Sequence, residues 1–245
     1  MEISNSHYLT DTLLIQEKIL YKVTKRSLQK VTKSNWHHYL NELGWSKLPR
    51  KWITYLNQLS ECREKNSLFG LLQCPQDGDC LFHCIANALN SRNQWLTYHN
   101  SRDIRSTIAD SIDEDDYQTL ISVYRAMKDA DDYENEWDPH DVRDIDEFRK
   151  LIKQSGHSYW GDSLLIQIIA SHYNFNILIY HSPDEETIQL YTLVHYDASK
   201  DTICLWFESD HFQLIGHYNG DQMVSWFSVG ELPKELYFIS QGHSE

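Results

Sequence analysis

The chain has 245 residues, 41% of them apolar, and a net charge of −14, a balance typical of a globular protein with one sizeable core. No stretch approaches the roughly 20 apolar residues of a membrane-spanning helix, and residues 1–20 lack the apolar block of a secretory signal. The five cysteines are an odd number without the spacing of a disulfide framework or a structural zinc site, so we expect a cytoplasmic protein without metal or cofactor.

The charge is unevenly distributed along the chain. Residues 1–65 carry 11 Lys and Arg against 6 Asp and Glu, whereas residues 66–245 carry 11 against 30. So acidic a surface repels phosphate backbones, which argues against nucleic acid as a partner and favours basic partners. The plainer alternative is that these charges only keep the protein soluble.

Residues 1–65 are predicted to form a helical N-terminal extension. Thr12–Leu28 is rich in helix formers, and Trp36–Leu43 and Trp52–Leu59 repeat apolar residues at helical intervals on either side of Gly44 and Pro49. The main domain is predicted to span residues 66–245.

A reactive cysteine is predicted near the start of this domain. The turn Asp77-Gly78-Asp79 is followed by Cys80 and by an apolar pattern of helical spacing, which places Cys80 at a helix N-terminus. Free N–H groups there stabilise a thiolate, and amides of the turn can converge into an oxyanion hole. The plain alternative is a small buried hydrophobic residue. A zinc site of Cys80, His83, Cys84 and a distant His has little support.

Further along the chain, residues 101–127 predict two helices separated by the acidic run Asp113–Asp116. Residues 129–147 hold ten acidic side chains around Trp137 and Pro139. They are interpreted as an acidic insert, a solvated and partly mobile loop, with a recognition surface as the alternative.

The C-terminal half predicts a buried helix followed by strands. Gly161-Asp162-Ser163 begins a helix that is apolar almost all round. Buried or alternating strands then follow, with turns between them, in the pattern of an antiparallel meander. We expect an α+β fold in which a mostly antiparallel sheet of about five strands packs between helices. The predicted strands are Asn174–Tyr180, Thr187–Val194, Thr202–Phe207 and His211–Ile215.

A cysteine hydrolase also needs a histidine as base. Of the thirteen His residues, His211 opens a strand and can be aimed across a cleft at a helix N-terminus, whereas His83 is only one helical turn past Cys80. Asp77 is favoured as the residue that orients the imidazole. Ser209 and Gln213 stay open as uncharged alternatives, and the adjacent Asp210 would point away from a regular strand.

These residues resemble the ovarian-tumour (OTU) family of cysteine peptidases over about residues 68–216. The resemblance is carried by four blocks in the family's order, namely 77–83 (DGDCLFH), 159–162 (YWGD), 176–180 (NILIY) and His211-Phe212. It implies an OTU-like fold and hydrolysis of the isopeptide or peptide bond after ubiquitin's C-terminal glycine, through a thioester. By that analogy Cys80 is the nucleophile, His211 the general base and Asp77 the acidic residue of the motif. Many relatives have Asp or Asn two residues from the His, where this chain has Ser209 and Gln213.

The resemblance names ubiquitin or polyubiquitin chains as the partner. Ubiquitin's tail carries arginines, which an acidic domain is suited to attract. The alternatives are an inactive ubiquitin-binding module on the same scaffold and a cysteine peptidase that acts on another ubiquitin-like modifier. The expected location is the cytoplasm, or the host cytosol for a viral or bacterial protein.

Overall fold

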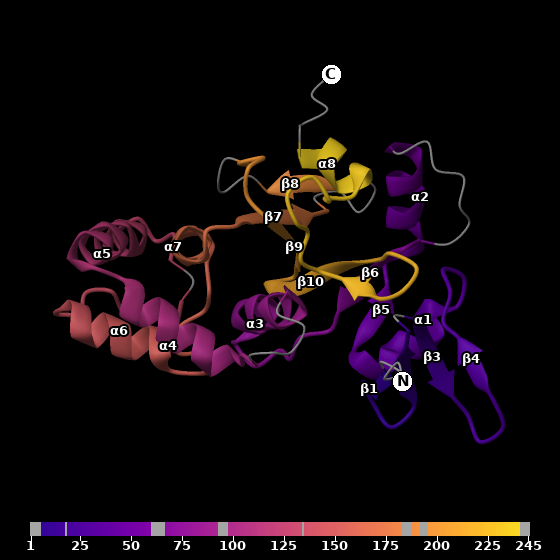
Figure 1. The fold of residues 1–245 in the computed structure, drawn as a ribbon. Helices are drawn as coiled ribbons and strands as arrows, with labels where there is room; N and C mark the ends of the chain where they lie inside the picture. The colour runs from indigo at the N-terminus through magenta and orange to yellow at the C-terminus, as the bar shows by residue number, and fades with distance from the viewer. Residues whose placement is uncertain are drawn as a thin grey trace.

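A mixed β-sheet forms the centre of the molecule (Figure 1). The structure, a computed structural model, describes residues 6–17, 19–59, 67–92, 98–133, 135–182, 188–191 and 196–240. The strands lie in the order β5-β6-β10-β9-β7-β8, with β11 paired to β10, and every pair is antiparallel except β7 and β9. The strands are β5 (Trp45–Lys47), β6 (Phe69–Leu72), β7 (Asn176–His181), β8 (Gln189–Tyr191), β9 (Thr202–Glu208), β10 (His211–Tyr218) and β11 (Met223–Val224).

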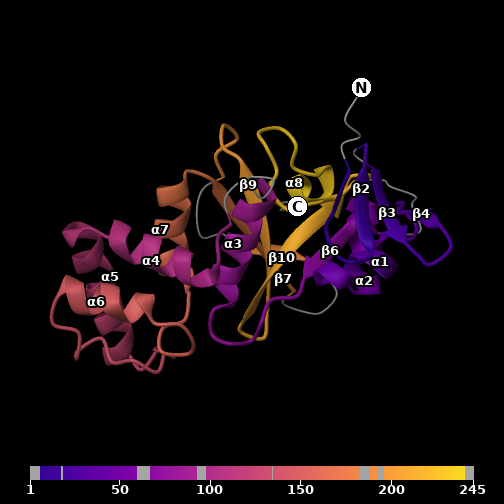
Figure 2. The same ribbon diagram turned by 60° about the horizontal axis from the view of Figure 1, so that its bottom comes forward.

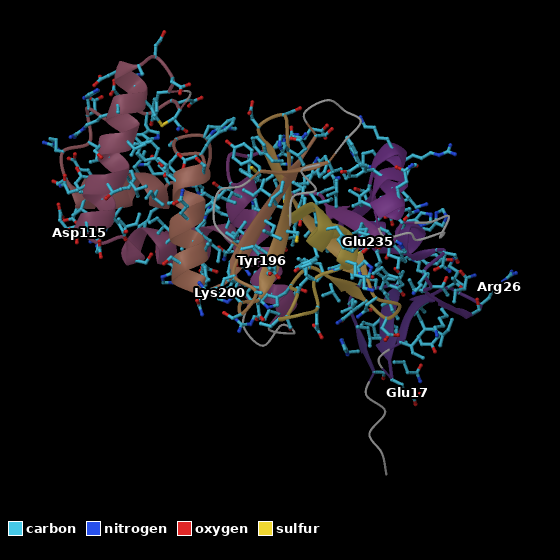
Figure 3. The ribbon with its side chains drawn as sticks, turned by 90° about the horizontal axis from the view of Figure 1, so that it is seen from above. Glu17, Arg26, Asp115, Tyr196, Lys200 and Glu235 are labelled. Carbon is cyan, nitrogen blue, oxygen red and sulfur yellow. The ribbon has the colours of Figure 1, made fainter. Side chains whose placement is uncertain are left out.

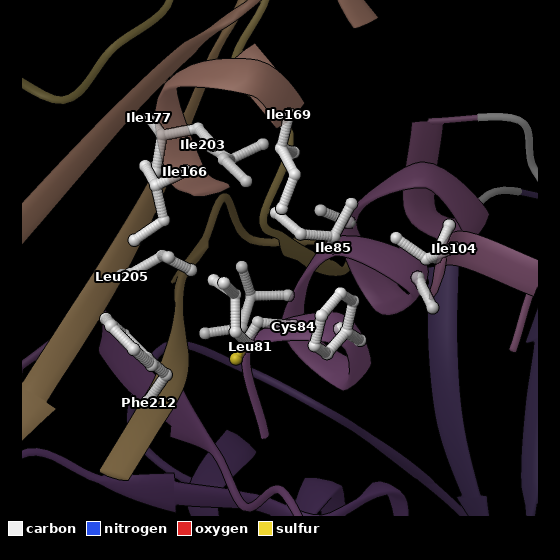
Figure 4. Packing of buried hydrophobic residues seen from close by; sticks show 14 of the residues in the cluster. Leu81, Cys84, Ile85, Ile104, Ile166, Ile169, Ile177, Ile203, Leu205 and Phe212 are labelled. Atoms are coloured by element: carbon white, nitrogen blue, oxygen red, sulfur yellow. The ribbon is translucent and has the colours of Figure 1, made fainter. Parts of the chain in front are cut away.

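Helices cover both faces of this sheet. On one face, Leu81 and Ile85 of α3 (Cys80–Arg92) pack with Leu205 and Phe212 of the sheet and with Ile169 of α7 (Ser163–Tyr173) (Figure 4). On the other face, α2 (Arg50–Leu59) and α8 (Lys234–Ser240) bury a second apolar cluster against the sheet. The helix that begins at Cys80 is therefore held rigidly by the main core.

The predicted pair of helices in residues 101–127 is confirmed. These are α4 (Ser101–Ser111) and α5 (Glu114–Asp129), and with α6 (Ile145–Lys153) they form a helical arm at one end of the molecule (Figure 2). Asp113 caps the N-terminus of α5 by accepting a hydrogen bond from the N–H of Asp116 at 2.9 Å. The acidic run therefore forms the first turn of α5 as well as separating α5 from α4.

The acidic segment between α5 and α6 is anchored to the helical arm. Trp137 and Val142 are buried, and the Arg125 guanidinium donates to the carbonyls of Pro139 and Val142 at 3.1 and 2.8 Å. Most acidic side chains of this segment are exposed, as expected, and α6 begins at Ile145, inside the predicted insert. In the described part, the expectation of a solvated loop therefore holds for the charged side chains and not for the apolar ones.

The helix predicted over Thr12–Leu28 is wrong. These residues contribute to a four-stranded antiparallel sheet, which consists of β1 (Ser6–Tyr8), β2 (Leu13–Gln16), β3 (Ile19–Val23) and β4 (Leu28–Lys30). Leu13 and Leu20 are both buried, and a spacing of seven fits one face of a helix as well as the two arms of a hairpin. The β-branched residues of β2 and β3 pack better on a sheet, and tertiary packing decided between the two.

The rest of the N-terminal prediction agrees better with the structure. Helix α1 (Trp36–Tyr39) and the 3₁₀ helix η1 (Leu40–Leu43) together span one of the two other predicted helical stretches, and α2 spans the other. Strand β5 pairs with β6, so the N-terminal extension supplies an edge strand of the central sheet. The predicted domain boundary after residue 65 falls on residues 60–66, which lie outside the described residues.

The predicted C-terminal meander is partly wrong. Strands β7 and β8 pair as expected, but β9 lies on the other side of β7 and runs parallel to it, with Ile177 opposite Ile203. Five of the six residues of β7 are buried, so that strand needs a neighbour on each side, whereas β8 is short and mostly exposed. The ends of the predicted strand Thr187–Val194 lie outside the described residues.

The α+β class predicted for the fold is confirmed, with a mostly antiparallel sheet between helices. Within the described ranges, every helix is too short or too polar to cross a lipid bilayer.

Candidate active site

The turn before α3 is formed by Asp77, Gly78 and Asp79. Gly78 has φ +85°, and a Cβ at this position would lie 2.3 Å from the carbonyl carbon of Gly156. The N–H of Asp79 donates to Asp77 Oδ1 at 3.0 Å, and the carbonyl of Asp79 accepts from the N–H of His83 at 2.9 Å. The turn is thus pressed against the loop at Gly156 and leads directly into the helix, as the sequence predicts.

Cys80 is the first residue of α3 and its thiol is partly buried. Burial raises the pKa of this thiol, and although the N–H groups of Phe212 and Leu81 oppose this by hydrogen bonding to the sulfur, the pKa stays above its usual value. We expected the helix terminus to favour the thiolate. In the structure desolvation outweighs it, so the resting thiol keeps its proton and needs a base to lose it.

His211 begins β10, directly before the residue whose N–H contacts the Cys80 sulfur. The main-chain carbonyl of Cys74, which follows the neighbouring strand β6, lies near the ring of His211. Burial lowers the pKa of His211, while the Cys74 carbonyl and the charge of Asp77 act in the opposite direction. The fold therefore brings the backbone beside His211 to the Cys80 sulfur across 131 positions of sequence, although no hydrogen bond joins the two side chains in the described ranges. The burial of His211 favours the neutral imidazole that a base requires.

Asp77 lies at the same site, but its hydrogen bonds go to other groups. Its Oδ2 is 3.1 Å from Nε2 of His83, and its Oδ1 accepts from the N–H of Asp79. Although burial raises the pKa of Asp77, the hydrogen bonds from His83 and Asp79 and the charge of His83 bring it below its usual value. Asp77 acts on His211 through its charge. His83, which we set aside because of its sequence proximity to Cys80, is the imidazole that Asp77 contacts.

The other candidates for orienting His211 make no side-chain hydrogen bond to any residue in the described ranges. Ser209 and Asp210 form the turn between β9 and β10 with φ +51° and +58°, so neither continues the face of the strand on which His211 lies. Gln213 is partly buried and lies on the same face as His211.

Arg105 is a residue of this site that the sequence analysis missed. It lies on α4, is fully buried, and its Nε donates to Asp79 Oδ1 at 2.8 Å. It also binds main-chain carbonyls on three segments around the site, those of Gly78, Ile152 and Tyr159. The sequence does show an arginine among the apolar residues of a predicted helix. Because a buried arginine needs a partner of opposite charge, this position could have indicated a buried ion pair.

The segment 159–162 forms the wall next to α3. A Cβ on Gly161 would lie 2.4 Å from Cδ2 of Leu81, so any larger residue would displace the side chain of the residue that follows Cys80. Asp162 caps α7 and accepts a hydrogen bond from the Tyr124 hydroxyl at 2.7 Å. The predicted helix start at Gly161-Asp162-Ser163 is therefore confirmed, and it also fixes this wall.

Asp77, Asp79 and His83 present ligand atoms within 4.8 Å of one another. Asp79 Oδ1 already accepts hydrogen bonds from the Arg105 guanidinium and from the N–H of Gly156. Cys84, a member of the weakly supported zinc set, is buried with its sulfur 3.5 Å from that of Cys74.

A model of the family described as OTU-like cysteine protease matches residues 75–218, which is more than half of the chain. The chain belongs to the OTU-like cysteine protease family. The matched range contains the turn, α3, the helical arm and strands β7 to β10, whereas β5 and β6 of the central sheet precede it.

Solved structures of OTU domains resemble the chain at low sequence identity. The OTUD1 OTU domain is 17% identical, with a TM-score of 0.43, and the match covers 67% of this chain and 91% of that domain. An OTU deubiquitinase from Wolbachia pipientis wMel, bound to ubiquitin, is 15% identical, with 62% and 98% covered and a TM-score of 0.41. The Hazara virus OTU bound to ubiquitin is 12% identical, with 64% and 85% covered and a TM-score of 0.38. No curated protein sequence matched the chain.

Proposed function

We propose that this OTU-family protein is a cysteine-dependent deubiquitinase that hydrolyses the isopeptide or peptide bond after the C-terminal glycine of ubiquitin. The observation that carries the proposal is the position of Cys80 at the first residue of α3, where the backbone N–H of Phe212, the residue after His211, acts on the thiol. The family supplies the expectation of ubiquitin as substrate.

In the proposed reaction His211 takes the proton of the Cys80 thiol as the sulfur attacks the carbonyl carbon of the terminal glycine. The tetrahedral intermediate collapses when His211 gives that proton to the leaving amine, and a thioester remains on Cys80. His211 then removes a proton from water, which attacks the thioester and releases the ubiquitin carboxylate and the free thiol. The lowered pKa of His211 suits it to accept the first proton at neutral pH.

In this proposal Asp77 acts by its charge. A carboxylate near His211 stabilises the imidazolium formed after proton transfer, and the pKa of Asp77 keeps that carboxylate ionised at neutral pH. Its direct contact with His83 holds it at the turn. Asp77 is therefore proposed as an electrostatic partner of the pair rather than as a hydrogen-bonded orienter.

The charge distribution supports a basic partner. Residues 66–245 carry 30 Asp and Glu against 11 Lys and Arg. Asp115 of α5, in this acidic part, lies at the opposite end of the molecule from Arg26 of the N-terminal sheet (Figure 3). The acidic part of the chain includes the proposed active site, and its negative charge is complementary to the positive arginines of a ubiquitin tail.

The test is covalent labelling by ubiquitin with an electrophilic C-terminus, followed by cleavage of a panel of diubiquitin linkages and of other modifiers that end in Gly-Gly. Cys80→Ala should abolish labelling and turnover, and His211→Asn should abolish turnover. The matched control, Cys204→Ala, removes a buried thiol of the other core and should keep both. Binding without labelling or turnover in the native protein would identify an inactive binding module, and labelling of Cys80→Ala would refute the assignment of the nucleophile.

A further inference from the structure

Arg105 joins the two loops that flank Cys80. Its guanidinium lies over the ring of Phe82 at 3.9 Å and contacts the Asp79 carboxylate. Its Nη2 donates to the carbonyls of Gly78 at 3.2 Å, Gly156 at 3.5 Å and Tyr159 at 2.9 Å. Asp79 Oδ1 accepts in turn from the N–H of Gly156 at 3.0 Å, so both loops converge on one buried ion pair.

These contacts fix one peptide group of the turn at both ends. The peptide between Gly78 and Asp79 has its carbonyl on Arg105 and its N–H on Asp77. The amides on either side are the N–H groups of Gly78 and Cys80, which make no hydrogen bond to any other residue in the described ranges. The N–H of Cys80 interacts only with its own sulfur. Both donors are therefore oriented by a peptide that itself cannot rotate.

We propose that Arg105 is a positioning residue for acyl transfer, because it holds the 77–80 turn so that the amides of Gly78 and Cys80 face the developing oxyanion. This inference rests on the proposed function. Donors for an oxyanion act only when their geometry is fixed in advance, since a small displacement weakens them in the transition state. Arg105 reaches this turn from α4 and touches neither the sulfur nor the imidazole.

Two reactions of the same sulfur separate positioning from general damage. Hydrolysis of ubiquitin with a fluorogenic C-terminal amide passes through an oxyanion, whereas alkylation of Cys80 by iodoacetamide forms none. The variant Arg105→Lys keeps the cation but loses the planar set of five donors. The matched control is Arg125→Lys, which likewise loses a clamp on two loop carbonyls, those of Pro139 and Val142, away from the 77–80 turn.

Arg105→Lys is expected to lower kcat by on the order of 10²-fold, with KM and the rate of Cys80 alkylation, followed by mass spectrometry, changed by less than about 3-fold. Arg125→Lys should leave all three near native values. If kcat and alkylation fall together, or if kcat does not fall, the inference is wrong while native turnover still upholds the proposed function. Absence of native turnover rejects both. Should Arg105→Lys fail to fold, Asp79→Asn replaces it with the same criteria, since it removes the charge that Arg105 binds but keeps an acceptor oxygen.

Discussion

Replacement of Gly78 by alanine tests how tightly the nucleophile turn is packed. The residue has φ +85°, which costs an L-residue roughly 1–2 kcal/mol. The new Cβ would also lie 2.3 Å and 2.4 Å from the carbonyl carbon and oxygen of Gly156 and 2.7 Å from the nitrogen of His157. These are main-chain atoms that cannot rotate away, and forced repacking adds roughly 1–3 kcal/mol. Gly78→Ala should therefore lower the free energy of unfolding by about 2–5 kcal/mol.

Gly230 provides a matched control because it shares the backbone conformation without the crowding. Its φ is +80°, and an added Cβ would meet nothing within 4 Å. Gly230→Ala should cost only the roughly 1–2 kcal/mol of the left-handed conformation. Urea unfolding of both variants and of the native protein, with equal m values, gives the two losses directly.

The difference between the two variants measures the steric contact alone. Gly78→Ala should also lose ubiquitin hydrolysis, since relief of the contact must move the 77–80 turn or the Gly156 loop, whereas Gly230→Ala should keep it. Equal losses of stability in the two variants would show that the loop at Gly156 moves aside freely, and the argument for a rigid turn would then fail.

Two further predictions concern stability. Burial lowers the pKa of His37 to about 4. As the pH falls below about 6.5, the unfolded chain therefore binds a proton at His37 that the folded protein does not bind. The free energy of unfolding, fully present above pH 6.5, should decrease by roughly 1–3 kcal/mol as the pH falls through about 4. The urea midpoint should decrease less between pH 7 and pH 4.5 in His37→Gln than in the native protein. An equal decrease in both proteins would count against His37 as the cause. Asp162→Ala removes the cap of α7 and the acceptor of the buried Tyr124 hydroxyl and should cost about 2–4 kcal/mol. Asp144→Ala removes only the exposed cap of α6 and should cost about 1 kcal/mol by the same measurement, so similar losses would contradict the role of Tyr124.

Local patterns predicted the parts of the protein that depend on neighbours in sequence. Gly78 before an apolar helical repeat predicted the turn and α3, and the structure has both. The cap at Asp162 and the helix that follows depend on three consecutive residues, and they too were predicted. Four motif blocks in order were sufficient to indicate the OTU family before any coordinates, and the family model confirms it.

Contacts between distant segments had to come from the tertiary structure. The spacing of Leu13 and Leu20 suits a helix and a hairpin equally, and only packing produced strands β2 and β3. Whether β9 lies beside β7 or β8 depends on which strand can be buried on both edges, and not on the order in the chain.

Within the candidate active site the same division applies. The sequence alone indicated Cys80, His211 and Asp77, because each residue type carries its chemistry wherever it lies. The tertiary structure decided that Asp77 contacts His83 and that Arg105 reaches the turn from α4. Hydrogen bonds and buried charge pairs depend on distances of a few ångströms between segments tens of residues apart, and no local pattern encodes such distances.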